Sequence, residues 1–88
     1  MKATVCKIEG AVVSLHIILK DYLENEILIS FLGEIFEFEI KFFTKKDEYL
    51  RNHKVKEIEV DDSLFEEIIE FYKSKKEIFL KMKEAFSL

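Results

Sequence analysis

The sequence predicts an α+β fold, in which an antiparallel β-meander of four to five strands is covered by one long C-terminal helix. Two observations support this prediction. The first half of the chain consists of strand-like apolar runs, and the only two glycines, Gly10 and Gly33, each separate two of these runs. In the last quarter, apolar residues recur at steps of three and four, which is the spacing of one helical stripe. At 88 residues, the chain is expected to form a single domain, residues 1–88.

The first two strands are expected on either side of Gly10, at about residues 2–9 and 12–20. A two-residue turn at Gly10-Ala11, with glycine in first position, is typical of a type II′ hairpin. This register pairs Cys6 with Leu15 and directs both side chains toward the covered face of the sheet. His16 then points to the opposite face, so Cys6 and His16 are not expected to converge.

The next two strands are expected on either side of Gly33, at about residues 26–32 and 35–43. A tight turn at Gly33-Glu34 pairs Phe31 with Phe36, and it separates an apolar face from a face that carries Glu37 and Glu39. The covered face is expected to bury Ile8, Leu15, Ile17, Ile29, Phe31, Phe36, Phe38 and Ile40 against Phe65, Ile68 and Tyr72. The outer face is also more apolar than a solvent face usually is, with Ala3, Val5, Val12, Ile18, Leu28, Leu32, Ile35 and Phe43.

The remaining elements follow from local patterns. Thr44 and Asp47 have the spacing of a capping box, so residues 44–53 form either a short helix or a polar loop. Residues 55–60 alternate between apolar and charged side chains, which predicts a short fifth strand at an edge of the sheet. The long helix is expected over about residues 63–86, with its glutamates early and its lysines late, as the helix dipole favours.

The helix is expected to be longer than the sheet that it covers. Some 24 residues make a rod of about 36 Å, whereas an eight-residue strand spans only about 27 Å. The overhang carries Phe79, Met82 and Phe86. Together with Val5, Ile18 and Leu28 on the outer sheet face, these side chains are expected to contact a second copy of the chain.

Composition limits the classes of function. The chain is 49% hydrophobic and therefore too apolar to be disordered. A net charge of −4 makes nonspecific binding to nucleic acid or anionic membranes unfavourable, and no segment has the length of a membrane span. The single cysteine and the charged N-terminal segment favour a cytoplasmic location. Abundant Lys and Glu with few amides is typical of thermophilic proteins, although an AT-rich genome produces the same bias.

Few residues offer catalytic or ligand-binding chemistry. The sequence contains none of the common phosphate-binding, dinucleotide-binding, zinc-protease or serine-hydrolase motifs, so no cofactor and no metal are expected. No catalytic residue is predicted, and His16, Glu37 and Glu39 are weak candidates for acid–base catalysis. Each has a simpler interpretation as a solvated residue on a strand.

The sequence therefore favours a small non-enzymatic protein–protein interaction module that forms a homodimer. An accessory or mobile-element protein, such as an inhibitor of host machinery, is compatible with this size. The first alternative is a nucleic-acid-binding module that uses Lys73, Lys76, Lys81 and Lys83 in the second half of the helix. The second alternative is a small enzyme with its site in a dimer cleft around His16, Glu37 and Glu39.

Overall fold

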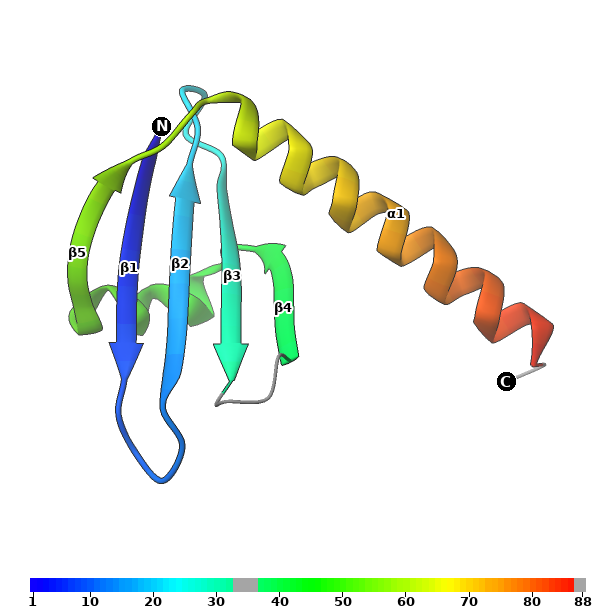
Figure 1. Ribbon diagram of the computed structural model, residues 1–88, viewed down its shortest axis with the longest axis horizontal. Helices are drawn as coiled ribbons and strands as arrows, with labels where there is room; N and C mark the ends of the chain where they lie inside the picture. Colours follow the sequence, from blue (N-terminus) through cyan, green and yellow to red (C-terminus); the bar gives the residue numbers. More distant parts are fainter. Residues whose placement is uncertain (33–36, 87–88) are drawn as a thin grey trace.

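The structure, a computed structural model, describes residues 1–32 and 37–86, and within this part it leaves out the side chains of Glu37, Phe38, Phe79 and Lys83. It shows a five-stranded antiparallel sheet and one long C-terminal helix, which confirms the predicted α+β fold (Figure 1). The elements in chain order are β1 (Lys2–Ile8), β2 (Ser14–Lys20), β3 (Glu26–Leu32), β4 (Glu37–Phe42), the 3₁₀ helix η1 (Lys45–His53), β5 (Lys54–Glu59) and α1 (Ser63–Ala85).

The strand order in the sheet is β4-β3-β2-β1-β5. The first four strands form the predicted meander, and β5 lies at an edge, also as predicted; its neighbour in the sheet is β1. The chain must therefore return from one edge of the sheet to the other between β4 and β5. It does so through η1, which passes behind β1 and β2 (Figure 1). Residues 44–53 are thus a short helix rather than a loop.

The predicted register of the first hairpin is wrong by one residue. Cys6 pairs with His16, and Ile8 pairs with Ser14, so five residues rather than two connect β1 and β2. Because side chains alternate between faces along a strand, this slip moves every side chain of β1 to the other face. Cys6 and Ile8 lie under η1, whereas Ala3 packs on the side of α1.

The second hairpin differs from its prediction by two residues, because Phe31 pairs with Phe38 rather than with Phe36. A two-residue shift keeps each side chain on its predicted face. Ile29 and Ile40 are now opposite each other, and both remain on the α1 side of the sheet, as predicted. The predicted turn at Gly33-Glu34, and with it Phe36, lies outside the described residues.

The sheet has an apolar core on each face. On one face, Leu50 of η1 packs on Cys6, Ile18 and Leu28, and all four side chains are fully buried. On the other face, Phe65 of α1 packs on three buried sheet residues, with further apolar contacts around them. Central strands that are covered on both sides are expected to carry continuous apolar runs, as β2 does at residues 17–19 and β3 does at residues 27–29.

Only the first half of α1 packs on the sheet. Phe65, Ile68 and Ile69 join the core, and the Tyr72 ring meets the edge of the Phe42 ring at 6.2 Å. Beyond this point the helix runs away from the sheet past β4 (Figure 1). The radius of gyration is 14.6 Å, whereas a compact domain of this length has about 12 Å. The predicted overhang of the helix is therefore present.

Candidate functional site

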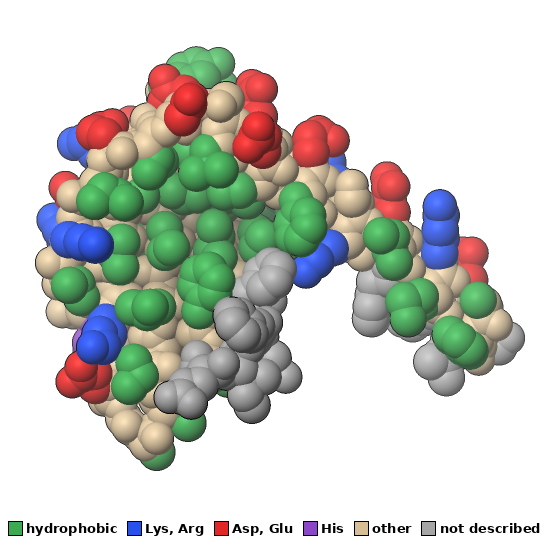
Figure 2. Space-filling model, in the orientation of Figure 1, with side chains coloured by type: hydrophobic (Ala, Val, Ile, Leu, Met, Phe, Trp, Pro, Cys, Tyr) green, Lys and Arg blue, Asp and Glu red, His purple; other side chains and the backbone are tan. Residues whose placement is uncertain are grey.

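The second half of α1 exposes several large apolar side chains to solvent. The exposed fractions are 57% for Ile78, 55% for Met82 and 69% for Phe86. On the face of the sheet opposite η1, further apolar side chains remain visible beside the helix (Figure 2). They include Leu15 and Phe42, which are 42% and 55% exposed. Several exposed apolar side chains of this size are typical of a protein–protein interaction site.

A groove of about 650 Å³ runs between the edge strand β4 and α1. Its strand side is formed by Glu39 and Ile40, and its helix side is formed by Tyr72, Lys75, Lys76, Ile78 and Met82. The groove exists because α1 diverges from the sheet after Tyr72. Its lining is mainly apolar, so a complementary apolar element would gain free energy by filling it.

The six predicted interface residues differ in how exposed they are in the structure. Met82 and Phe86 are exposed on α1, and Val5 is half-buried on the α1 side of the sheet. The expectation that Ile18 and Leu28 are exposed is wrong, because η1 covers them and leaves only 1% and 2% accessible. The Phe79 side chain lies outside the described part.

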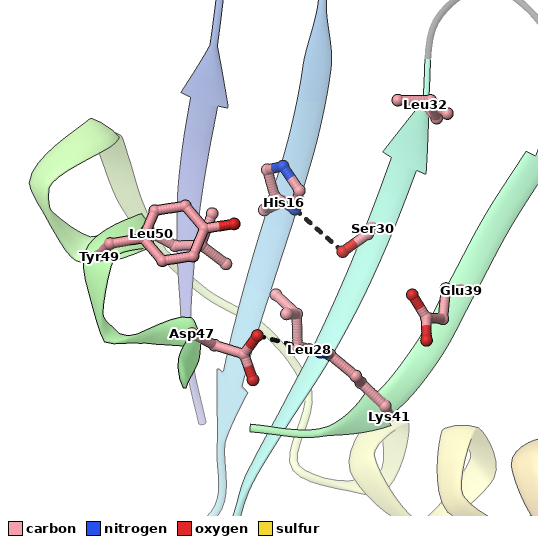
Figure 3. A pocket seen from close by; sticks show the side chains of 9 residues that line it. All are labelled: His16, Leu28, Ser30, Leu32, Glu39, Lys41, Asp47, Tyr49 and Leu50. Atoms are coloured by element: carbon pink, nitrogen blue, oxygen red, sulfur yellow. Dashed lines mark hydrogen bonds and ion pairs between the residues drawn. The ribbon is translucent and has the colours of Figure 1, made fainter. Parts of the chain in front are cut away.

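A second, polar pocket of about 400 Å³ lies on the other face of the sheet, between the strands and η1 (Figure 3). Its centre is His16 on β2, whose Nδ1 lies 2.9 Å from Ser30 Oγ and whose Nε2 lies 3.0 Å from Ser14 Oγ. Ser14 and Ser30 come from the start of β2 and the middle of β3. The remaining lining residues are Leu28, Leu32, Glu39, Lys41, Asp47, Tyr49 and Leu50.

The charges in this pocket are partly paired. The Lys41 ammonium donates to Asp47 Oδ1 at 3.0 Å, and Thr44 donates to Asp47 Oδ2 from both its backbone N–H and its hydroxyl at 2.9 Å. Burial opposes ionisation of Asp47, but these hydrogen bonds outweigh it and lower the pKa of the carboxyl. Burial also lowers the pKa of His16, although the charge of Asp47 acts in the opposite direction.

The pocket brings together two of the three predicted catalytic candidates, since His16 and Glu39 both line it. The Glu37 side chain lies outside the described part. A neutral imidazole beside a serine hydroxyl can accept a proton. In this pocket, however, both ring nitrogens of His16 form hydrogen bonds with serine hydroxyls. A catalytic histidine is normally oriented by a carboxylate instead. The arrangement is therefore suited to positioning His16 rather than to activating Ser30.

Cys6 and His16 share a face of the sheet, which corrects the prediction that they point apart. Cys6 is nevertheless fully buried, and burial raises the pKa of its thiol, so it remains a protonated core residue. Among the described residues, no group of three or more His, Cys, Asp and Glu side chains is placed to hold a metal ion.

The lysines predicted to bind nucleic acid do not line up along one side of α1 in the part of the helix that the structure describes. Lys73 lies 3.8 Å from Glu70, and Lys76 lines the groove beside β4. Lys81 follows Lys76 by five residues, which rotates it by about 140° around the helix. The Lys83 side chain lies outside the described part. These positions do not form a continuous track for a phosphate backbone.

Sequence reasoning missed most of the polar pocket. Ser14 and Ser30 could have been found only with the register between β2 and β3, which pairs His16 with Ser30 and which the separate hairpin predictions did not specify. Lys41 and Asp47 come together because η1 folds back over the sheet. The local signals for that helix were the capping spacing of Thr44 and Asp47 and the i,i+4 spacing of Asp47 and Arg51.

Comparisons with protein families, with curated proteins and with solved structures found no match to this chain. In the described part of the chain, no helix is both long enough and apolar enough to cross a lipid bilayer.

Proposed function

We propose that the protein is a non-enzymatic protein–protein interaction module that acts as a homodimer. The observation that carries this proposal is the exposed apolar surface of α1, where Ile78, Met82 and Phe86 are each more than half accessible. A chain of 88 residues buries a smaller fraction of its surface than a larger domain does, so association adds stability that the monomer lacks.

The shape of the helix supports the same proposal. The second half of α1 makes no described core contact with the sheet, and an isolated helical segment of this length is only marginally stable in water. Packing against another protein surface would supply the missing burial. The buried free Cys6 is compatible with a reducing, cytoplasmic location, which we include in the proposal.

Two substitutions that place a charged side chain on the apolar side of α1 test this function. We expect Ile78→Glu and Met82→Glu to convert the dimer to a monomer in sedimentation velocity experiments at about 20–50 µM, where a dimer with a dissociation constant of about 1 µM is mostly associated. Leu80→Glu is the matched control, because Leu80 is 50% exposed but lies on the opposite side of the helix. The proposal is wrong if the unmodified chain is already a monomer at these concentrations.

A further inference from the structure

The apolar surface of α1 contains a regular repeat. Seven residues follow one another at alternating steps of four and three: Leu64, Ile68, Phe71, Lys75, Ile78, Met82 and Ala85. This is the heptad spacing by which two helices pack side by side. The repeat lies beside the stripe of Phe65 and Tyr72 that faces the sheet of the same chain. Ile68 of the repeat also packs against this core, whereas Ile78 and Met82, farther along the helix, are more than half exposed.

The groove beside β4 coincides with this repeat. Lys75, Ile78 and Met82 belong to the heptad positions, and all three line the groove together with Ile40. A second helix placed along the repeat would therefore rest on β4 as well as on α1. An amphipathic helix lying in an apolar groove is a common mode of recognition.

The charge distribution indicates which helix fits there. The first turns of α1 carry Glu66, Glu67 and Glu70, and the later turns carry Lys73, Lys76 and Lys81. A parallel copy would place like charges beside each other, whereas an antiparallel copy places the acidic half of one helix beside the basic half of the other. Antiparallel packing also opposes the two helix dipoles and produces the two-fold symmetry of most homodimers.

One alignment satisfies the repeat and the charges together. Glu67, Ser74 and Lys81 occupy the same flanking position in successive heptads. When Glu67 of one copy lies opposite Lys81 of the second copy, the symmetry places Ser74 opposite Ser74. In antiparallel helix pairs, residues at this flanking position face each other and form interhelical ion pairs.

We propose that the occupant of the groove is the α1 helix of a second copy, packed antiparallel with Glu67 opposite Lys81. This inference rests on the proposed homodimer and specifies its geometry. The pairing covers Ile78 and Met82 in both copies, and it supports the second half of α1 along its length. The two sheets then lie at opposite ends of the helix pair.

Disulfide cross-linking in a redox buffer at low micromolar protein tests this geometry. We expect the double variant Glu67→Cys/Lys81→Cys, and also Ser74→Cys, to give a covalent dimer on a nonreducing gel. Lys81→Cys alone is the control, because antiparallel packing separates the two copies of this position by about 21 Å along the axis, beyond the reach of a disulfide. The native Cys6 is fully buried and is not expected to contribute.

The outcomes separate this inference from the proposed function. Light scattering on the same reduced samples reports whether a dimer forms at all. If a dimer forms but Lys81→Cys alone cross-links, the helices are parallel and the antiparallel geometry is wrong. If a dimer forms and neither the double variant nor Ser74→Cys cross-links, a different surface pairs the copies. If all samples are monomeric, both the geometry and the homodimer are wrong.

Discussion

The two helices of this protein contrast sharply in how they use their residues. The helix η1 has nine residues, yet its Leu50 is 1% exposed and its Asp47 is 6% exposed. The helix α1 has 23 residues, but among its described side chains only Phe65 is buried, with 8% exposed. The length of a helix therefore does not indicate how much it contributes to the core.

Polar contacts follow the same contrast. Arg51 of η1 donates to Glu26 of β3 at 2.5 Å, and its guanidinium lies 4.6 Å from the centre of the Phe43 ring. Asp47 is bonded to Lys41 and Thr44. On α1, the described polar contacts of Lys73 and Ser74 stay within the helix. The short helix completes the fold of one chain, whereas the long helix has apolar surface available for a partner.

The largest effect is expected from shortening the central apolar residue of η1. Leu50→Ala leaves a cavity against Cys6, Ile18 and Leu28, and it should lower the free energy of unfolding by about 2–4 kcal/mol. Leu80→Ala on α1 removes the same atoms from a half-exposed site and should change the free energy of unfolding by less than about 0.5 kcal/mol. Urea denaturation measures both. Equal losses would contradict the difference between the two helices.

A smaller loss is expected at the buried carboxylate of η1. Asp47→Ala removes the hydrogen-bond acceptor for Lys41 and for the backbone N–H of Thr44. It should lower the free energy of unfolding by about 1–3 kcal/mol. Glu77→Ala on α1 removes an exposed carboxylate and serves as the control. Thermal unfolding followed by circular dichroism compares the two variants. If both variants unfold at the temperature of the unmodified chain, Asp47 does not fasten η1 to the sheet.

Charge-reversal variants test the proposed ion pair between Glu67 of one copy and Lys81 of the other. Glu67→Lys places two lysines opposite each other at both ends of the helix pair, and it should weaken dimerisation by about 1 kcal/mol. Adding Lys81→Glu restores opposite charges and should return the dissociation constant to its original value. Dilution experiments by light scattering measure this cycle. Additive weakening in the double variant would show that Glu67 and Lys81 do not meet.

The smallest effect concerns the acidity of His16. Burial and the nearby His53 lower its pKa, while Asp47 raises it, and the net pKa lies below the ordinary value. The unfolded chain therefore binds more protons than the folded chain just below pH ~6.5, so stability falls as the pH decreases through this range. His16→Asn should make this pH dependence shallower in urea denaturation at several pH values. An unchanged slope would show that His16 is not responsible.

The sequence predicted the elements of this fold better than their register. Alternating apolar and polar residues located the strands, and the spacing of Phe65, Ile68 and Tyr72 located the helix. The hairpin at Gly10 was misplaced because β1 carries apolar side chains on both faces, with Ala3 and Val5 on one face and Cys6 and Ile8 on the other, so a one-residue slip does not expose an obviously unsuitable residue. Only the packing of η1 on the sheet distinguishes the two alternatives.

The candidate sites show the same limit. The exposed helix end, with Met82 and Phe86, was predictable because it depends only on the length of a local element. The burial of Ile18 and Leu28 was not predictable, because it depends on where the segment between β4 and β5 folds back. The polar pocket around His16 also required that long-range arrangement.

The mass of the protein in solution tests the central claim most directly, namely that α1 is completed by a second copy. Multi-angle light scattering across a dilution series should give twice the 10.5 kDa mass of one chain at high protein concentration. The mass should fall only on dilution, and Met82→Glu should abolish the dimer. A mass of one chain at every concentration would contradict the claim and leave the apolar side of α1 without its proposed partner.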